Sequence, residues 1–258
     1  MAKLSEIIRI LERIAPLSES EEWDNCGLNI DGGDDEVTGI AVCLDATEDA
    51  IAQAVRENCN LLVTHHPLIF SPLKAVAPAA PTYPAIRAAI RNRVSVYSMH
   101  TCLDSVSGGI GDEMAALYGI RNPKALDGEK EGLGRVGAIA RTLVKDLAKK
   151  TEKLFDFPAF VCGNDEAEVD VLAVINGGSA DEELIARAVK QGAQCVITNE
   201  IKHHIALYAQ SLGVALISSS HFATERFYIP ALALKIEKEI KKIKVTICEE
   251  SNPLHVVK

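Results

Sequence analysis

The stretch GIAVCLDATEDAIAQAVRENCNLLVTHHPLIF, residues 39–70, decides the fold class of this chain. It opens with a short apolar run, continues through a polar turn into a helical pattern, and reaches a second apolar run at residues 61–64. Both apolar runs are continuous rather than alternating, which is typical of strands covered on both faces of a sheet. The order strand, helix, strand predicts a βαβ unit with a right-handed crossover.

A second stretch, VLAVINGGSADEELIARAVKQGAQCVITNEIKHH at residues 171–204, follows the same plan. Thr47 and Ser179 are the predicted helix N-caps, because each is a hydroxyl residue followed by acidic residues that suit a helix N-terminus. Each stretch leads to a further helix and a further buried strand, at residues 85–91, 205–212, 94–97 and 214–217. We therefore predict an α/β fold of two similar α/β units, an internal repeat with mostly parallel sheets.

Polar, glycine-rich composition between residues 121 and 165 marks the predicted boundary between the repeats. We place the first repeat at residues 1–125 and the second at residues 126–258. A C-terminal helix is expected from about Pro230, with a strand at residues 244–248, and both can pack on the first repeat.

GLGRVG, residues 132–137, matches the glycine pattern of dinucleotide-binding turns. That fingerprint requires a strand immediately before it and a helix immediately after it, and the sequence suggests neither. We interpret GLGRVG as a plain turn and predict no cofactor-binding motif there.

The composition is that of an ordinary globular protein, with 258 residues, 48% hydrophobic, 24% charged and a formal net charge of −9. The negative charge argues against sequence-independent binding to nucleic acid or to anionic membranes, which need a concentrated positive surface. No apolar stretch approaches the ~18 residues that span a bilayer, so we predict no membrane segment and a cytoplasmic location. The seven scattered cysteines, never spaced C-x-x-C, suggest neither a disulfide framework nor a thiolate zinc site, and we expect Cys43, Cys195 and Cys248 to be buried free thiols.

Most histidines of the chain follow predicted strands, and only His255 stands apart from the six others: His65, His66, His100, His203, His204 and His221. The carboxyl ends of parallel strands meet at one edge of an open sheet, so these side chains are expected to gather in a crevice between the two units. Imidazole and carboxylate together suit borderline divalent ions such as Zn, Fe, Mn or Co. In each half a histidine is followed four residues later by a carboxylate, at Asp104 and at Glu225.

The sequence thus predicts a divalent metal site made by His65, His66, Asp104, His221 and Glu225. Because successive side chains alternate along a strand, the tandem histidines indicate either two metal ions or an irregular turn, which Pro67 makes easy. If the segment after residue 220 is helical, the spacing of His221 and Glu225 puts both on one face. Two roles stay open for three histidines, a structural hydrogen bond or the orientation of ligands: His100, His203 and His204.

Two carboxylates near these motifs are interpreted as turn residues. Asp24 belongs to the cluster of Trp23 and Asn25, in which the tryptophan is predicted to be a core residue. Asp45 is expected in the turn before the first crossover helix, although it follows a strand, where sites in α/β sheets collect.

These motifs resemble those of the NIF-three-like dinuclear metal centre proteins, often labelled GTP cyclohydrolase 1 type 2 homologues. The resemblance covers nearly the whole chain, through WDNCGL at Trp23, THHPLIF at Thr64, HTCLDSVSGG at His100, VINGG at Val174 and HFATE at His221. It implies two divalent ions per subunit, held by the five residues named above, and a homohexamer with its sites facing an inner cavity. The chain departs from the family pattern at Asn199 and Ser220, where the family usually has glycine.

The leading hypothesis is a metal-dependent hydrolase acting on a C–N or phosphate bond of a nucleotide-like small molecule, as the family label implies. Paired ions would lower the pKa of a bound water, and Glu200 or His100 is the candidate proton shuttle. The alternative is a non-catalytic hexameric metal-binding scaffold or regulatory protein. The motifs fit both hypotheses, which differ in whether the metals keep a coordination position open for water.

Overall fold

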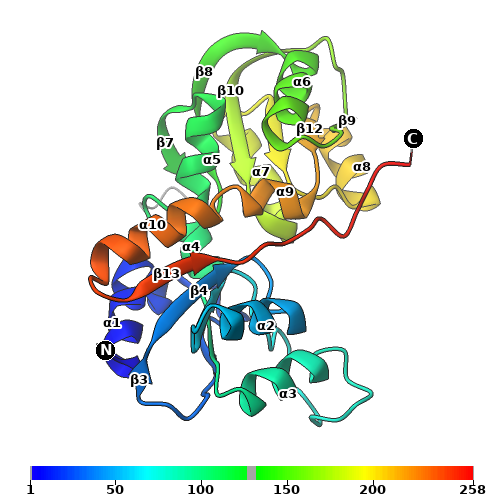
Figure 1. Cartoon of the computed structure of the whole chain (residues 1–258). Helices are drawn as coiled ribbons and strands as arrows, with labels where there is room; N and C mark the ends of the chain where they lie inside the picture. The colour runs from blue at the N-terminus through cyan, green and yellow to red at the C-terminus, as the bar shows by residue number, and fades with distance from the viewer. Residues whose placement is uncertain (1, 127–131, 258) are drawn as a thin grey trace. The chain divides into compact units, whose positions relative to one another are not determined.

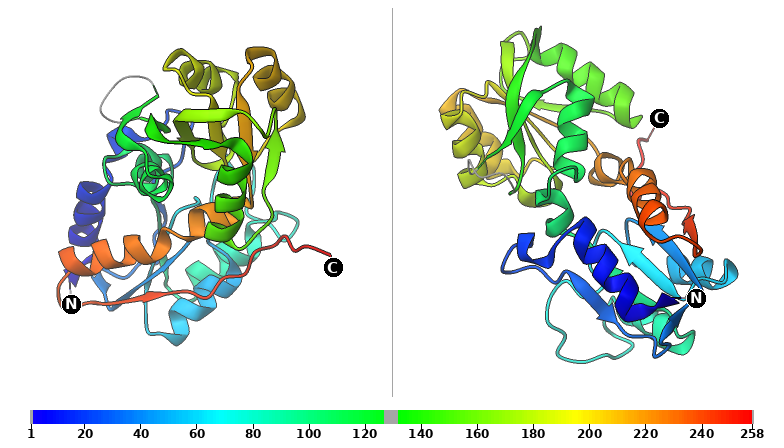
Figure 2. Two further views of the ribbon diagram at one scale, coloured as in Figure 1. Left: turned by 90° about the horizontal axis from the view of Figure 1, so that it is seen from above. Right: turned by 90° about the vertical axis from the view of Figure 1, so that its left-hand side faces the viewer.

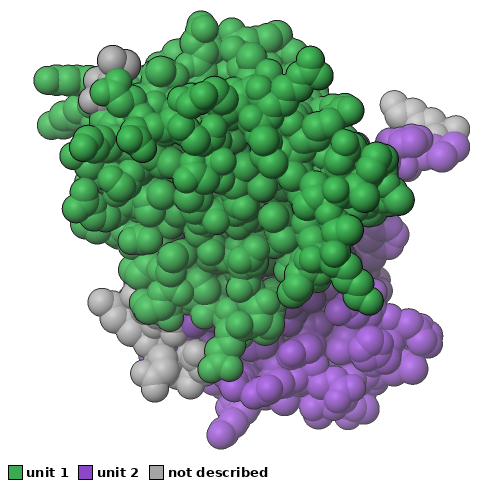
Figure 3. Space-filling model, turned by 90° about the horizontal axis from the view of Figure 1, so that it is seen from below, with its two compact units in different colours: residues 1–103, 228–251 green, residues 104–227, 252–258 purple. Residues whose placement is uncertain are grey.

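The computed structural model describes residues 2–126 and 132–257, which form two compact units (Figure 1). Unit 1 comprises Met1–Leu103 and Tyr228–Ser251, and unit 2 comprises Asp104–Phe227 and Asn252–Lys258 (Figure 3). This division differs from the one predicted at residues 125 and 126. The difference has a physical reason, because the helix at residues 110–118 packs on the second sheet, the strand at residues 121–125 joins that sheet, and the C-terminal strand returns to the first.

Unit 1 is built on a five-stranded sheet whose strands lie in the order β13 (Lys244–Ile247), β4 (Gly39–Cys43), β5 (Leu61–Thr64), β6 (Ser95–Ser98) and β2 (Gly27–Ile30). The first four strands run parallel, and β2 pairs with β6 antiparallel. A separate antiparallel pair joins β1 (Ala2–Lys3) to β3 (Glu36–Val37). One face of the sheet packs on α2 (Glu48–Arg56) and α3 (Tyr83–Arg91). The opposite face carries α1 (Leu4–Ile14) and α10 (Ile229–Glu239), which contact each other (Figures 1 and 2).

Unit 2 is built on a six-stranded sheet in the order β7 (Arg121–Ala125), β8 (Arg135–Leu143), β10 (Glu168–Ile175), β11 (Cys195–Thr198), β12 (Ala215–Ser218) and β9 (Phe160–Cys162). Its central strands β10, β11 and β12 are parallel, and antiparallel strands flank them. The helices α5 (Ile110–Tyr118) and α6 (Val144–Phe155) pack on one face. The other face packs on α7 (Glu182–Lys190) and α8 (His203–Leu212), as the green and yellow segments of Figure 2 show.

The two units share a core of three parallel strands joined by crossover helices, so the predicted α/β fold with an internal repeat is confirmed. The strands β4, β5 and β6 of unit 1 correspond to β10, β11 and β12 of unit 2. Every residue of β5 and of β11 is buried, because helices cover both faces of each sheet. In unit 2, for example, Ile197 packs toward α5 and α6, whereas its neighbour Val196 packs toward α7 and α8.

Of the two helix N-caps predicted from the sequence, one is confirmed and one is wrong. The hydroxyl of Thr47 caps α2 by accepting a hydrogen bond from the backbone N–H of Ala50 at 3.0 Å. The predicted cap at Ser179 is wrong, because Ser179 lies in a 3-10 turn and the carboxylate of Asp181 accepts from Leu184 instead. No helix directly follows GLGRVG, as predicted, but only residues 132–134 lie outside regular structure, because the strand β8 already begins at Arg135 within the motif.

Helix length and the state of the cysteines bear on two further expectations from the sequence. No helix in residues 2–126 and 132–257 has both the length and the apolar character needed to cross a membrane. All seven cysteines are free thiols, and the predicted burial of Cys43, Cys195 and Cys248 is confirmed. Burial raises the pKa of the Cys195 thiol to about 12, which keeps it protonated and unreactive.

Candidate metal centre

Three histidines of unit 1 cluster at the carboxyl edge of its sheet. His65 and His66 follow β5, and His100 follows β6 just before the short helix α4 (Thr101–Ser105). The parallel register pairs Thr64 with Ser98, so both strands release the chain at the same edge. Ring centroids are 4.9 Å apart for His65 and His66, 5.2 Å for His65 and His100, and 5.5 Å for His66 and His100. One nitrogen from each ring lies within 4.8 Å of the other two, as in a metal-binding group.

The hydrogen bond of His65 fixes which of its ring nitrogens can bind a cation. His65 is fully buried, and its Nδ1 lies 2.9 Å from the backbone oxygen of Met99. A carbonyl oxygen only accepts hydrogen bonds, so the proton resides on Nδ1. The lone pair is therefore on Nε2, which is the state that a metal ligand needs.

The other two histidines of the cluster use carboxylates for the same purpose. His66 Nδ1 lies 2.8 Å from Asp45 Oδ1, and His100 Nδ1 lies 2.9 Å from Asp24 Oδ1. A carboxylate bound to Nδ1 orients the ring, sets its tautomer and raises the basicity of Nε2. Both carboxylates were interpreted from the sequence as turn residues, so this role was missed.

Asp24 is held in place by more than His100. Its Oδ2 accepts hydrogen bonds from the backbone N–H and the hydroxyl of Thr101 and from the thiol of Cys26. Burial raises the pKa of the Asp24 carboxyl, but the hydrogen bonds from His100 and Thr101 outweigh it and hold the pKa well below its ordinary value. Asp24 is thus a charged acceptor at neutral pH. Its neighbour Trp23, predicted to be a core residue, is 56% exposed.

Asp45 is positioned from the C-terminal part of unit 1. The carboxylate of Glu250 accepts hydrogen bonds from the backbone N–H groups of Leu44 and Asp45, with distances between 2.9 and 3.0 Å. These bonds fix the turn after β4 from which Asp45 reaches His66. The sequence contains no local signal for a contact between residues so far apart in the chain.

In unit 2 the candidate ligands are His221 and Glu225. The helix α9 (His221–Arg226) contains both, and its geometry puts them on one face, as the spacing predicts. His221 Nε2 lies 2.9 Å from Glu225 Oε2, and His221 Nδ1 lies 2.8 Å from Glu200 Oε1. Glu200 therefore orients the ring of His221 in the same way as Asp45 orients the ring of His66.

Glu225 is enclosed by the ends of the neighbouring strands. It is only 1% exposed, and its Oε1 accepts a hydrogen bond from Asn199 Nδ2 at 3.0 Å. Gly177 follows β10 with a φ of +65°, and a side chain there would bring its Cβ to 3.2 Å from Glu225 Oε1. The two departures from the family pattern have local roles, since Asn199 holds Glu225 and the hydroxyl of Ser220 caps α9.

The remaining predicted residues lie in different settings. Asp104 is buried in the last turn of α4, and the division between the units falls directly before it. His203 and His204 begin α8 and are exposed. His255 is exposed as well.

The donor set fits a divalent cation. Four histidines direct Nδ1 to a carbonyl or a carboxylate, so Nε2 is the ring atom with which each can bind a cation or exchange a proton: His65, His66, His100 and His221. Close approach of an imidazole nitrogen and a carboxylate oxygen, as in His221 and Glu225, is also found between two ligands of one ion. Beside this pair the buried amide oxygen of Asn199 and the whole buried amide of Asn176 lack hydrogen-bond partners among the described residues. Candidate histidine and glutamate metal-binding groups are therefore present in the structure.

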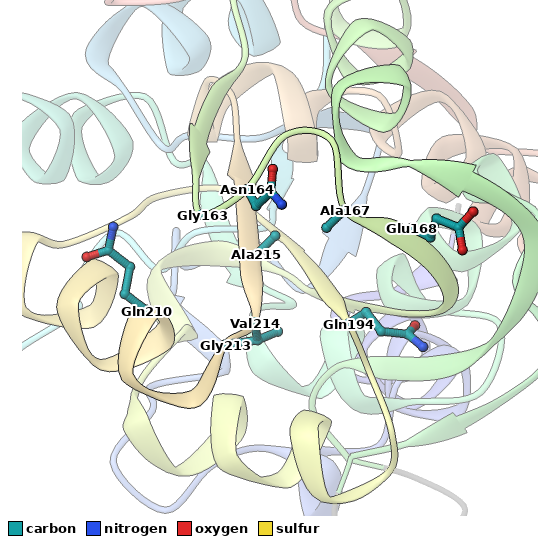
Figure 4. A pocket seen from close by; sticks show the side chains of 9 residues that line it. All are labelled: Gly163, Asn164, Ala167, Glu168, Gln194, Gln210, Gly213, Val214 and Ala215. Carbon is teal, nitrogen blue, oxygen red and sulfur yellow. The ribbon is translucent and has the colours of Figure 1, made fainter.

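A pocket of about 450 Å³ in unit 2 is separate from these groups (Figure 4). Gln194 and Val214 line it, and they precede β11 and β12 respectively. The pocket thus lies at the amino ends of the parallel strands, whereas Asn199 and Glu200 follow the carboxyl end of β11. It holds none of the candidate ligands.

Comparison with known sequences gives matches along almost the entire chain. The profile of the Duf34/NIF3 family, described as NGG1p interacting factor 3, matches residues 2–253. A protein of Helicobacter pylori named GTP cyclohydrolase 1 type 2 is 33% identical over 258 residues, with all of both chains covered. A GTP cyclohydrolase 1 type 2 homolog of Clostridium acetobutylicum is 31% identical over 250 residues, which cover 93% of this chain and 92% of the relative.

Solved structures share the whole fold. A Bacillus cereus protein related to NIF3 superposes with a TM-score of 0.90 at 19% identity, covering 99% of each chain. Reduced HcgD from Methanocaldococcus jannaschii superposes with a TM-score of 0.82 at 28% identity, covering 95% of this chain and 97% of that one.

Proposed function

This chain belongs to the Duf34/NIF3 family, and on that premise we propose that it is a metal-dependent hydrolase that binds two divalent ions through His65, His66, Asp104, His221 and Glu225. The observation that carries the proposal is the set of histidines whose Nδ1 atoms are each bound to an acceptor. A histidine that binds a metal usually donates its other ring N–H to a carboxylate or a backbone carbonyl, which orients Nε2 toward the cation. Zn, Fe, Mn and Co all suit these donors.

When bound, the ions would supply Lewis acidity and lower the pKa of a bound water toward neutrality. The chain's own residues set the conditions for that chemistry. Asp45 and Glu200 hold the Nδ1 protons of His66 and His221, so that both rings stay fixed and basic at Nε2. Asn199 holds one oxygen of Glu225 and leaves the other beside His221.

We assign the proton shuttle to His100 and a positioning role to Glu200. His100 lies beside His65 and His66, and the charged carboxylate of Asp24 at its Nδ1 favours uptake of a proton at Nε2. Glu200 is half-exposed and directs an oxygen to His221, which suits orientation of a ligand. The name of the Helicobacter pylori relative supports hydrolysis of a C–N bond in a nucleotide-like small molecule.

The second candidate function is a non-catalytic metal-binding scaffold. The observation that favours it is the burial of His65 and Glu225, which are 0% and 1% exposed. Ligands so deep in the protein also suit an ion that stabilises the fold without exchanging water. For either function we propose a cytoplasmic homohexamer, which is implied by the family resemblance and is tested by light scattering of the purified protein.

Elemental analysis with an activity screen tests the proposal. Purified protein should contain up to two ions per chain, and the variants His65→Ala and Glu225→Gln should lose them, whereas His255→Ala, which changes an exposed histidine, should keep them. Metal-loaded protein should hydrolyse a compound in a panel of nucleotides and phosphoesters, and Asp104→Asn should abolish that turnover. Unchanged metal content in both ligand variants would refute the ligand set. Full metal content without turnover in the whole panel would favour the scaffold.

A further inference from the structure

Two aromatic side chains beside the histidine cluster of unit 1 have no role in the proposed function. Trp23 is 56% exposed and Phe70 is 54% exposed. Their ring centroids lie 5.8 Å apart, with the ring planes inclined by 52°. Adjacent large aromatic rings this open to solvent are characteristic of surfaces that bind something.

The segments that carry the two rings are tied together. Asn25 Nδ2 donates a hydrogen bond of 2.6 Å to the backbone oxygen of Ile69, and the backbone N–H of Ile69 donates one of 3.1 Å to Asn29 Oδ1. On the other side of Trp23, the carboxylate of Asp24 is fixed by Thr101 and His100. The segments that carry the rings are thus held together before any ligand arrives, which reduces the entropy lost on binding.

The two rings also lie directly beside the histidine cluster of unit 1. The imidazole of His100 meets Trp23 edge-on, with centroids 6.2 Å apart and planes inclined by 76°. It meets Phe70 in the same way, at 5.9 Å and 75°. A ligand stacked on these rings would therefore be adjacent to His100, and through it to His65 and His66.

We propose that Trp23 and Phe70 form an aromatic platform that binds a planar nitrogen heteroaromatic ring, of the kind found in nucleobases, next to His100. Because the two rings are inclined by 52°, one of them stacks on the face of the ligand and the other contacts its edge. Stacking on aromatic side chains recognises the flat face of such a ring whatever its substituents. This inference rests on the proposed function only for the identity of the bond that is cleaved. Binding of the ring to Trp23 and Phe70 does not depend on it.

Fluorescence provides a direct test, because Trp23 is the only tryptophan of the chain. Titration of the full-length protein with guanosine should quench the emission saturably, and adenosine should do the same. Ribose 5-phosphate, which has no aromatic ring, should leave the emission unchanged. Absence of quenching by both nucleosides, or equal quenching by ribose 5-phosphate, would overturn the proposal.

Variants separate stacking on the platform from adventitious quenching. Phe70→Leu should weaken guanosine binding by about tenfold, in the range found when a stacked aromatic is removed. The matched control is Phe160→Leu, which removes a phenylalanine of unit 2 that is 61% exposed, and it should not change the affinity. Calorimetry with Trp23→Leu should show a similar loss. Equal weakening by Phe70→Leu and Phe160→Leu would contradict the platform.

Two further readouts exclude competing explanations. If a second copy of the chain covers the rings, the emission will be blue-shifted, will depend on protein concentration and will not respond to guanosine, which overturns the proposal. Guanosine titrations before and after chelation separate this inference from the proposed function. Quenching that persists in protein with neither bound metal nor turnover would support the platform alone, whereas metal-dependent turnover without quenching would refute the platform alone.

Discussion

The segments that follow β5 in unit 1 and β11 in unit 2 begin alike and carry different chemistry. Each strand ends in a buried threonine, Thr64 or Thr198. The next two residues are His65 and His66 in unit 1, but Asn199 and Glu200 in unit 2. In unit 1, His66 of this segment is oriented by Asp45, which follows the neighbouring strand β4. In unit 2 the roles are reversed, because Glu200 of this segment orients His221, which follows the neighbouring strand β12.

This exchange shows what the repeated framework determines and what it leaves free. The parallel strands determine where side chains leave the sheet, and therefore that imidazole and carboxylate can meet. They leave free which strand end supplies the imidazole and which supplies the acceptor at its Nδ1. Two different residue patterns thus produce the same pair, a histidine with its Nδ1 bound to a carboxylate.

The largest expected effect tests whether the two pairs are equivalent. Asp45→Asn and Glu200→Gln each remove the charged acceptor of a ligand histidine, so each should weaken metal binding by about 10- to 100-fold, as is usual for such partners. Competition with a chelator measures the affinity. Glu168→Gln changes an exposed carboxylate paired with Arg141 and serves as the control. A loss in only one of the two variants would show that the pairs are not equivalent.

Asp24 makes unit 1 sensitive to acid. Its pKa is lowered in the folded state, so below its ordinary value of 3.8 the unfolded chain binds more protons than the folded one. The stability from this carboxylate is therefore present above pH 3.8 and is lost as the pH falls further. Asp24→Asn should lower the free energy of unfolding by about 2 kcal/mol at pH 7, because it weakens hydrogen bonds to a charged group.

Urea unfolding at a series of pH values measures this effect. The difference in unfolding free energy between the parent and Asp24→Asn should shrink as the pH falls from 4 toward 2. A difference that stays constant with pH would assign the loss to packing rather than to the charge of Asp24.

The two threonines should respond differently to the same change. Thr64 Oγ1 lies 3.0 Å from Ser98 Oγ and donates to the backbone oxygen of His66 at 2.7 Å. Thr198 Oγ1 is buried and has no hydrogen-bond partner among the described residues. Thr64→Val should therefore cost about 1 to 2 kcal/mol in the free energy of unfolding, whereas Thr198→Val should cost about 0. Equal costs, measured by chemical denaturation, would mean that Thr198 has a bound water or ligand as its partner.

The smallest expected effect concerns the glycines beside Glu225. Gly177→Ala places a Cβ at a φ of +65° and 3.2 Å from Glu225 Oε1, so it should destabilise the protein by about 1 kcal/mol. A Cβ at Gly178 would meet no atom within 4 Å, and the φ of Gly178 is ordinary, so Gly178→Ala is the matched control and should be near neutral. Thermal unfolding compares the two variants. Equal stability would show that Glu225 moves freely away from Gly177.

The sequence was sufficient to predict the parallel strands and the histidines at their ends, because continuous apolar runs and short-range spacing specify both. It was insufficient for the acceptors at Nδ1. Asp24 and His100 are 76 residues apart, and no local pattern signals a hydrogen bond over that distance. For the same reason the position of His203 and His204 after a strand did not reveal that the helix α8 leaves both exposed.

The hydrogen bonds from Leu44 and Asp45 to Glu250 affect the order in which the protein can be completed during translation. Glu250 and β13 follow all of Asp104–Phe227 in the chain, so the ribosome makes them only after most of unit 2. Until then the edge of β4 lacks its partner strand, and the turn that carries Asp45 lacks its anchor. A nascent chain can therefore fold most of unit 2 first, and His66 acquires its fixed partner late in synthesis.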